Sequence, residues 1–474
     1  MRTIVWFRQD LRTHDNAALA AAAARGAVVP VYILDEENAP EWRLGGASRW
    51  WLHHSLTALR DDLGALALFK GAPRKILPAI VRELGANAVY WNRCYEPYAI
   101  ARDKELKASL QNLGIEAQSF TGNLLHEPWE IATRAGGPFS VYTPYWRASL
   151  AKPVMVPLAA PKLILEVPDA YGDRLNDWQL LPTRPNWAAG WDKLWKPGEA
   201  GALACLDAFT RDGLKDYEKL RDRPDLQGTS RLSPHLRWGE ISPRQIWARI
   251  TFAGHDASMQ KGANKFLSEL GWREFSYHLL YHFPTLPQEN WRREFDAYPW
   301  RDSSDDLKAW RRGRTGYPLV DAGMRELWQT GWMHNRVRMV VASFLVKHLR
   351  IDWRRGAAWF WDTLVDGDVA NNAAGWQWVA GSGADAAPYF RFFNPVMQGR
   401  KFDPNGDYVR RWCPELSHLP NEFIHAPFST PPGVLANAGV ELGRSYPQPL
   451  IDHNRARVDA LASYEQVRAA RALN

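Results

Sequence analysis

The chain has 474 residues and a formal charge of +7, and 46% of its residues are hydrophobic. This length exceeds one ordinary core and indicates two or three domains of a globular protein. The three cysteines, Cys94, Cys205 and Cys413, form neither a CxxC motif nor an even-numbered set, which argues against disulfide stapling and against a cysteine-ligated metal site. We therefore expect no bound metal and a reducing compartment.

The N-terminal sequence and the net charge bear on the compartment and the partner of the protein. The opening MRTIVWFRQDLR carries charges where a signal peptide has its apolar core, and no apolar run approaches the ~20 residues of a membrane span. We expect a cytoplasmic protein that does not enter membranes. The positive charge favours a polyanionic partner, although a solvated basic surface explains it equally well.

Short apolar runs alternate with helix-like stretches up to about residue 120. The runs TIVWF, VVPVYIL, LALF and AVYW lie at 3–7, 28–34, 66–69 and 88–91, and helical patterns such as 16–25 and 48–63 separate them. This alternation is typical of an α/β domain with a doubly wound parallel sheet. WFRQDLR follows the first strand in place of a GxGxxG turn, which disfavours ordinary nicotinamide binding.

The rest of the chain divides into a connector and a helical region. Residues 126–200 are rich in proline, glycine and tryptophan and show little sustained periodicity, which indicates a long surface connector. Helical patterns follow at 202–212, 243–252, 262–282, 318–330, 334–349, 357–364 and 455–472. We predict an α/β domain at 1–125, a connector at 126–200 and an all-α domain at 201–474.

Two segments of the helical region combine polar groups in unusual ways. GTSRLSPHLRWGEIS at 228–242 offers hydroxyl and amide groups at a helix start, which can hold a diphosphate, although a plain capped helix is the simpler interpretation. SELGWREFSYH places Glu269, Trp272, Arg273 and Ser276 on one helical face. That face suits neither a core nor a solvated surface, so a binding surface explains it better.

The segment 330–395 has the most unusual composition in the chain. It contains TGWMHNRVRM, DGDVANNAAGWQW and APYFRFFNP, so charged and amide groups lie among large aromatic rings. Buried polar groups need partners, and a planar redox cofactor with polar edges supplies them. Asn335, Arg338 and Met339 share a helical face, and Arg338 has a natural counter-charge in Asp366 or Asp368.

These motifs occur together in one known family. GTSRLS, ELGWREF, TGWMHNRVRM, DGDVANN, GWQW and YFRFFNP follow one another in a chain that opens with VWFRQDLRTHDN. The chain closely resembles the DNA photolyase and cryptochrome flavoproteins over essentially its whole length, and specifically the microbial cyclobutane pyrimidine dimer photolyases. The resemblance implies an α/β antenna-binding domain followed by an all-α, FAD-binding catalytic domain.

The resemblance implies that the cofactor is FAD, reduced and anionic when active. Asn372 matches the asparagine that hydrogen-bonds flavin N5, and Arg338 matches the flavin-facing arginine, with Asp366 and Asp368 as its partners. The implied FAD-binding residues are Tyr217, Thr229, Ser230, Arg231, Leu232, Ser233, Arg338, Asp366, Gly367, Asp368 and Asn372.

The resemblance also implies that the partner is UV-damaged DNA, bound by a monomer. Trp272 and Trp378 match two indoles that enclose a flipped-out dimer, and Glu269 matches a carboxyl group that stabilises the radical anion of the dimer. Asn335 and Met339 match further dimer contacts. The positions that match phosphate contacts are Arg221, Arg273, Arg336, Arg391 and Gln398.

The implied reaction is driven by light. Photoexcited reduced FAD donates an electron to the flipped dimer, the cyclobutane ring opens, and the electron returns to the flavin. Trp376, Trp353 and Trp300 match an indole relay that delivers electrons to the oxidised flavin, and with Glu269 and Asn372 they form the implied catalytic set. Spacing in the sequence does not show such a relay, because a core role explains each tryptophan equally well.

Other members of the family remain as alternatives. A cryptochrome that senses blue light without repairing DNA would bind FAD and carry the same relay. We expect repair, because no long C-terminal extension is present and the dimer-pocket set Glu269, Trp272, Met339 and Trp378 is complete. A (6-4) photolyase carries histidines where this chain has Asn335 and Met339, scattered cysteines disfavour the iron-sulfur branch, and nothing resembles the nicotinamide site of a flavin reductase.

A second, antenna chromophore is expected, but its identity stays open. One folate-binding mode has Asn and Glu after the YE motif, where this chain has Tyr98 and Ala99, which leaves a deazaflavin, a folate held differently, or none. Trp50 and Trp51 either stack on such a ring or, as the simpler interpretation, fill a helix core. Ala373 and Ala374 after the asparagines leave class I and class III both open.

Overall fold

The computed structural model describes residues 1–37, 40–389 and 391–472, so Phe390 of the YFRFFNP motif lies outside the described residues. The chain forms two compact units, each built from separate stretches of sequence. Unit 1 comprises Met1–Lys215, Ser230–Pro284 and Val365–Ala370. Unit 2 comprises Asp216–Thr229, Thr285–Leu364 and Asn371–Asn474. These limits differ from the ranges 1–125, 126–200 and 201–474, which follow sequence pattern alone.

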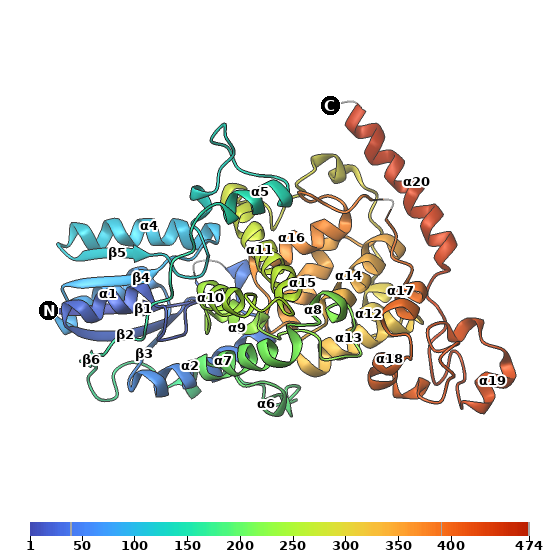
Figure 1. The fold of residues 1–474 in the computed structure, drawn as a ribbon, viewed down its shortest axis with the longest axis horizontal. Helices are drawn as coiled ribbons and strands as arrows, with labels where there is room; N and C mark the ends of the chain where they lie inside the picture. Colours follow the sequence, from blue (N-terminus) through green and yellow to red (C-terminus); the bar gives the residue numbers. More distant parts are fainter. Residues whose placement is uncertain (38–39, 390, 473–474) are drawn as a thin grey trace. The chain divides into compact units, whose positions relative to one another are not determined.

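Unit 1 contains a parallel sheet with strand order β3-β2-β1-β4-β5, and the short β6 also pairs with β2 (Figure 1). The order reverses between β1 and β4, so the prediction of a doubly wound parallel sheet is confirmed. The strands are β1 Arg2–Phe7, β2 Ala27–Leu34, β3 Ala67–Lys70, β4 Ala88–Asn92, β5 Glu116–Phe120 and β6 Ile164–Leu165.

The helices α1 to α4 connect successive strands of the sheet, and the other helices of unit 1 lie further along the chain. The helices of unit 1 are α1 Ala17–Arg25, α2 Gly46–Leu63, α3 Pro73–Leu84, α4 Pro97–Asn112, α5 Tyr142–Leu150, α6 Trp191–Leu194, α7 Glu199–Ala208, α9 Ser233–Trp238, α10 Pro243–Ala253 and α11 Gln260–His282. Leu77 of α3 and Leu106 of α4 pack on Ile4, Trp6 and Val89 of the sheet. All eight residues of β2 are buried, as expected for a parallel strand covered on both faces.

The turn after β1 is a structural junction. Arg12 is fully buried, and its guanidinium donates hydrogen bonds to the carbonyl oxygens of Asp15, Gly122 and Gly239 and to Asn123 Oδ1. Burial lowers the pKa of Arg12. A guanidinium that satisfies four acceptors ties the turn to distant backbone, which gives WFRQDLR a structural use in place of the absent glycine-rich turn.

The remaining elements are helical, as predicted. They are α8 Tyr217–Leu220, α12 Ser304–Arg311, α13 Pro318–Thr330, α14 Asn335–Ser343, α15 Trp353–Thr363, α16 Val369–Ala380, α17 Pro395–Phe402, α18 Asp407–Trp412, α19 Pro432–Asn437 and α20 His453–Ala472, with the π-helical turn η6 Phe344–His348 continuing α14. Beyond Leu165 the described residues form no further named strand. No helix among them has the length and apolar character needed to cross a membrane.

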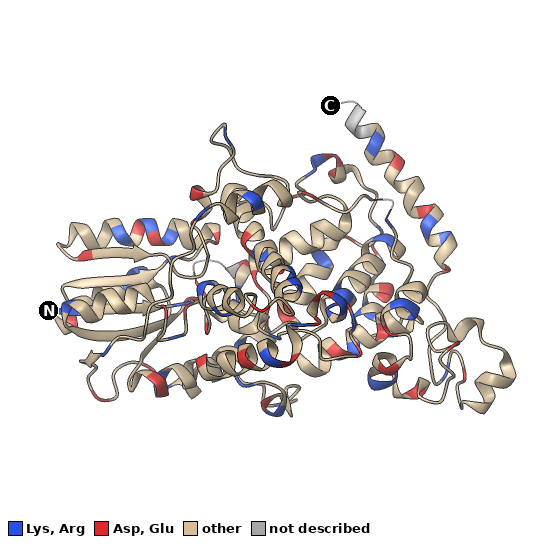
Figure 2. Cartoon of the chain, viewed as in Figure 1, with Lys and Arg blue, Asp and Glu red and all other residues tan. Residues whose placement is uncertain are grey.

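The predicted connector, residues 126–200, includes short regular elements. It contains α5 and β6, and α5 buries Tyr142, Tyr145 and Ser149, which lie three and seven residues apart. This helical spacing was hidden because Pro144 interrupts a short apolar run. The three cysteines are free thiols, in line with the sequence analysis. Basic residues occur on helices of both units (Figure 2).

A buried polar network ties α2, α7 and α9 together inside unit 1. Trp51 Nε1 donates to Glu240 Oε1 at 2.9 Å, Glu240 pairs with His235 Nδ1, and Cys205 Sγ lies 3.9 Å from His235 Nε2. Trp50 and Trp51 are both buried, which supports the core interpretation of this pair. Burial alone would disfavour the imidazolium, but Glu240 and Cys205 raise the pKa of His235 to about 9.

This network predicts a pH-dependent stability. Because the folded-state pKa of His235 lies above its ordinary value of 6.5, its contribution is complete below pH 6.5 and is lost as pH rises through about 9. We expect the free energy of unfolding to fall by on the order of 2 kcal/mol across that window. Denaturant unfolding at a series of pH values measures it. Glu240→Gln should remove the slope; an equal slope in both proteins would contradict the assignment.

Candidate functional site: a hydroxyl-rich turn, a basic pocket and a tryptophan cluster

Two predicted FAD-binding segments meet inside unit 1. Ser233, at the start of α9, donates its hydroxyl to Asp366 Oδ2 at 2.6 Å. Arg237, one turn further along α9, donates from Nε to the carbonyl oxygen of Gly367 at 2.7 Å. The two motifs are 133 residues apart in sequence, so the tertiary fold alone brings the hydroxyl-rich turn and the DGD turn together.

Arg237 is a residue that the sequence analysis missed. It is buried, and although burial lowers it, the neighbouring Tyr277, Glu96 and Asp368 raise its pKa above the ordinary value. Its position four residues after Ser233 on a short helix was the available signal. A permanent positive charge in this place suits an anionic ligand or the carboxylates of the DGD turn.

The hydroxyl-rich turn has a strained backbone. Arg231 adopts φ +53°, a left-handed conformation that residues other than glycine rarely take. Thr229 and Ser230 beside it are half-buried, and Leu232 is buried. Strained residues cluster at ligand-binding sites, where the surroundings hold them in place. Hydroxyls, a strained turn and a nearby buried arginine form a donor set that fits the diphosphate of FAD.

Helix α11 carries the predicted substrate residues of unit 1. Trp272 stacks on Tyr142 of α5, with ring centroids 3.8 Å apart and an interplanar angle of 11°. Tyr142 OH donates to the carbonyl oxygen of Ser268, which holds the pair in place. Glu269 is half-buried and pairs with Lys265 at 2.9 Å, one turn earlier. Tyr142 was not predicted, because it lies in the segment read as connector.

Arg273 has structural partners in unit 1. Its guanidinium donates to Asn123 O at 2.9 Å and pairs with Glu274 at 2.7 Å, and its side chain is only 10% exposed. Burial raises the pKa of Glu274 to about 7, against the opposing effect of Arg273. The assignment of Arg273 as a phosphate contact therefore stays a prediction, beside a role in packing that the structure displays.

Helix α14 begins with the predicted residues of TGWMHNRVRM. Asn335 is exposed, whereas Arg336, Arg338 and Met339 are half-buried. Arg338 donates from Nε to the carbonyl oxygen of Met333 at 2.7 Å, and its guanidinium lies 5.9 Å from the ring centroid of Trp332. Its pairing with Asp366 or Asp368 remains a prediction.

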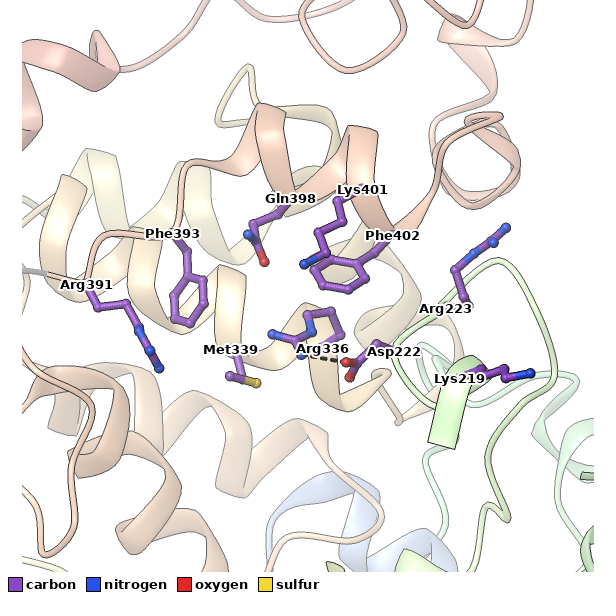
Figure 3. A pocket seen from close by; sticks show the side chains of 10 residues that line it. All are labelled: Lys219, Asp222, Arg223, Arg336, Met339, Arg391, Phe393, Gln398, Lys401 and Phe402. Atoms are coloured by element: carbon purple, nitrogen blue, oxygen red, sulfur yellow. Dashed lines mark hydrogen bonds and ion pairs between the residues drawn. The ribbon is translucent and has the colours of Figure 1, made fainter. Parts of the chain in front are cut away.

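Unit 2 contains a pocket of about 620 Å³ that is both basic and apolar (Figure 3). Its lining comes from α14, from α17 and the segment before it, and from residues 219–223: Lys219, Asp222, Arg223, Arg336, Met339, Arg391, Phe393, Gln398, Lys401 and Phe402. Arg336 pairs with Asp222 at 2.8 Å, and its guanidinium lies 4.5 Å from the ring centroid of Phe402. Four predicted DNA-contact residues thus share one pocket: Arg336, Met339, Arg391 and Gln398.

The other predicted residues of unit 2 lie on its helices. Tyr217 is buried at the start of α8, and the guanidinium of the half-buried Arg221 lies 5.8 Å from its ring centroid. Asn372 of α16 donates from Nδ2 to the carbonyl oxygen of Ala357 at 3.0 Å. This bond orients the amide, so that its carbonyl oxygen is the atom available to accept from a ligand. Trp378, six residues further along α16, is half-buried.

The three predicted relay tryptophans belong to one hydrophobic cluster of unit 2, in which Trp300 packs against a core that contains Trp353 and Trp376. Trp353 is fully buried, and its Nε1 donates to Asn290 Oδ1 at 2.9 Å. Trp376 packs edge-on against Phe360 with ring centroids 5.0 Å apart. Gly356, one turn after Trp353, is so close to the ring of Trp376 that a Cβ there would lie 2.1 Å from it.

The comparisons with known proteins agree with this architecture. Residues 3–162 match the family model described as DNA photolyase, and residues 266–466 match the FAD binding domain of DNA photolyase. The chain is 53% identical to a deoxyribodipyrimidine photo-lyase of Agrobacterium fabrum, over 98% of each chain, and 40% identical to Cryptochrome-1 of Arabidopsis thaliana, over 99% of this chain and 71% of that one.

The solved structures give the same result. The structure of a bacterial class III photolyase from Agrobacterium tumefaciens matches with a TM-score of 0.95 and 52% identity, covering 99% of this chain and 98% of that one. The chain belongs to the photolyase and cryptochrome family. Its C-terminal region contains the FAD binding domain of that family, so the cofactor inferred from the sequence is supported. Among the described residues no cluster of potential metal ligands is present.

The close contact at Gly356 predicts a sensitive position in the tryptophan cluster. Gly356→Ala should destabilise the protein by roughly 1–3 kcal/mol, because the new methyl group must displace the ring of Trp376 or its neighbours. Thermal unfolding measures the change. Gly375→Ala on α16 is the matched control, since a Cβ there meets nothing within 4 Å and should be neutral or stabilising. Equal shifts in both variants would contradict the packing.

Proposed function

We propose that the protein is a deoxyribodipyrimidine photo-lyase, which uses blue or near-ultraviolet light to split cyclobutane pyrimidine dimers in DNA. The observation that carries the proposal is the pocket of unit 2, where Arg336 and Arg391 stand beside Met339 and Phe393. Guanidinium groups suit a phosphate backbone, and apolar and aromatic walls suit a base pair removed from the stack. A flipped dimer presents both kinds of surface.

Of the two classes that the sequence left open, we propose class III for this chain. Support comes from the bacterial class III photolyase structure that matches nearly the whole chain. We also propose an antenna-binding domain at 1–125, a connector at 126–200 and a catalytic domain at 201–474. A monomeric, cytoplasmic enzyme with a folate or deazaflavin antenna completes the proposal.

The FAD ligands divide by the part of the cofactor they suit. Thr229 and Ser230 offer hydroxyl donors for the diphosphate, and the backbone of Arg231, Leu232 and Ser233 offers amide donors, since the Ser233 hydroxyl already donates to Asp366. Arg338 supplies positive charge for an anionic flavin, and Asp366 to Asp368 hold the turn that supports α9. Tyr217 contributes an aromatic wall. When bound and reduced, FAD supplies the electron that light transfers to the dimer and then recovers.

Asn372 holds the position that selects the reduced cofactor. Its amide nitrogen is occupied by the carbonyl oxygen of Ala357, so its own oxygen is presented as an acceptor. Flavin N5 carries a proton only after reduction, and an acceptor therefore favours the reduced form. A fixed amide also costs no reorganisation when the reaction occurs.

The dimer-side residues act through shape and hydrogen bonding. Trp272, held flat against Tyr142, offers a rigid indole surface for a planar base, and Trp378 is assigned a second indole contact. Glu269 and Asn335 supply polar groups at the edge of the dimer, with Met339 as an apolar contact. Arg221, Arg273, Arg336, Arg391 and Gln398 are assigned to the DNA backbone. Different residues are thus assigned to the transient charge on the dimer and to the permanent charge of the phosphates.

Trp376, Trp353 and Trp300 are assigned to reductive activation of the flavin. All three rings belong to one closely packed hydrophobic cluster, which supports the transfer of an electron through it. The same relay would serve a light-sensing cryptochrome, and the 40% identity to Cryptochrome-1 of Arabidopsis thaliana keeps that function as the second candidate. Repair activity separates the two.

The decisive experiment is photorepair. Purified protein should release FAD on denaturation, and after reduction blue light should restore the ultraviolet absorbance of thymine in dimer-containing oligonucleotides. Omitting light is the control. Absence of FAD would end the flavoprotein assignment, whereas bound, fully reduced FAD without repair would favour the cryptochrome alternative.

Glu269 is predicted to act on the dimer rather than on FAD. Glu269→Ala should slow repair about tenfold, because the transient negative charge on the dimer loses a stabilising group, while FAD content stays unchanged. Lys265→Ala is the matched control, since it removes only the surface ion pair with Glu269. Equal loss of FAD and repair in Glu269→Ala would remove this residue from the substrate side.

A further inference from the structure

Lys347 is a buried lysine that none of the functions above uses. It belongs to η6, the π-helical turn that continues α14, and its side chain is fully buried. Its Nζ donates to the carbonyl oxygen of Tyr389 at 3.1 Å and to the carbonyl oxygen of Arg391 at 2.9 Å. The ammonium also lies 5.1 Å from the ring centroid of Tyr389. One side chain therefore binds backbone on both sides of residue 390.

A charge in this position is costly for folding. Burial, and to a smaller extent the positive charge of Arg391, lower the pKa of Lys347 to about 7. A methionine of similar length would fill the space without that desolvation cost. The ammonium offers what an apolar side chain does not, namely two directed donors for carbonyl groups of a segment more than 40 residues away.

The segment held by Lys347 leads directly into the pocket of unit 2. Tyr389 is anchored a second time, because its hydroxyl donates to Tyr298 OH at 2.7 Å and its ring stacks on Tyr464. Arg391 is exposed, and it lines the pocket together with Phe393 (Figure 3). The hydrogen bond from Lys347 to the carbonyl oxygen of Arg391 therefore restrains the backbone of this exposed arginine.

The same continuous helix supplies the opposite part of this pocket. Arg336 and Met339 lie near the start of α14, and Lys347 lies in the turn that continues it. The start of this helix therefore carries two pocket residues. Its end binds the backbone of the segment that carries two others, Arg391 and Phe393.

We propose that Lys347 is a positioning residue for DNA binding, which fixes the backbone at Tyr389 and Arg391 so that Arg391 and Phe393 stand in register with Arg336 and Met339. The inference rests on the proposed function, since it takes damaged DNA as the ligand of the pocket. It assigns Lys347 no contact with DNA or with FAD. Its effect is on the affinity for damaged DNA and not on the chemistry of bound DNA.

The first test compares Lys347→Met with wild type. We expect the dissociation constant for a duplex containing one thymine dimer to rise about fivefold to tenfold, because Arg391 loses its fixed placement. FAD content and the repair rate at saturating DNA should stay unchanged. Ser343→Ala, in the preceding turn of the same helix, is the control, since its buried hydroxyl has no side-chain partner among the described residues. An unchanged dissociation constant in Lys347→Met would overturn the proposal.

A mutant cycle separates positioning from general loss of stability. Arg391→Ala removes the guanidinium that Lys347 is proposed to place. If Lys347 acts through Arg391, the double variant should bind dimer DNA about as weakly as Arg391→Ala alone. Fully additive losses would show that Lys347 acts elsewhere, and would overturn the proposal even if both single variants bind weakly.

A measurement on wild type covers the case in which Lys347→Met does not fold. Of the titratable groups around Lys347, His348 is neutral because burial lowers its pKa to about 3. Burial also lowers the pKa of its partner His453 and raises that of Tyr389, and Arg391 is the neighbouring cation that helps to lower the pKa of Lys347 itself. Raising the pH from 6 to 8.5 should therefore weaken dimer-DNA binding several-fold in wild type and less in Arg391→Ala. Equal pH profiles would overturn the proposal, whereas a wild type that repairs no dimers would instead overturn the proposed function.

Discussion

The seating of the DGD turn on helix α9 is the constraint on which the site depends. The hydroxyl of Ser233 binds Asp366, and the guanidinium of Arg237 binds the carbonyl oxygen of Gly367. Helix α16 starts at Val369, immediately after this turn. The chain uses charged and hydroxyl groups here because a buried turn needs directed partners for its polar atoms.

Helix α16 carries three residues with different environments. Asn372 is oriented by the carbonyl oxygen of Ala357, Trp376 packs beside Gly356 and Phe360 in the tryptophan cluster, and Trp378 is half-buried. Successive residues of a helix face different directions, so one rigid element can present an amide, a core indole and a partly exposed indole at once. Packing against α15 fixes the rotation that makes this possible.

The pocket of unit 2 shows how partly buried positive charge is given partners within the fold. Arg336 is paired with Asp222 and lies against the ring of Phe402, so its charge is neutralised and its apolar edge is covered. Lys347 is buried at the end of the same helix and takes backbone carbonyl groups as partners. Such partners hold cations in place, while apolar neighbours such as Met339 and Phe393 shape the cavity.

The sequence by itself determined the family, the doubly wound sheet and most helix positions, because strand alternation, helical spacing and contiguous motifs are local patterns. The roles predicted for Asn372, Arg338 and Trp272 rest on the family resemblance that these motifs carry. Arg237, Tyr142 and Lys347 were not found from the sequence, since their partners lie far along the chain and no local pattern encodes such contacts. Only the tertiary structure joined Ser233 to Asp366, gathered the three relay tryptophans in one cluster and placed Arg336 and Arg391 in one pocket. Those pairings come from packing distant segments together, which residue spacing along the chain does not specify.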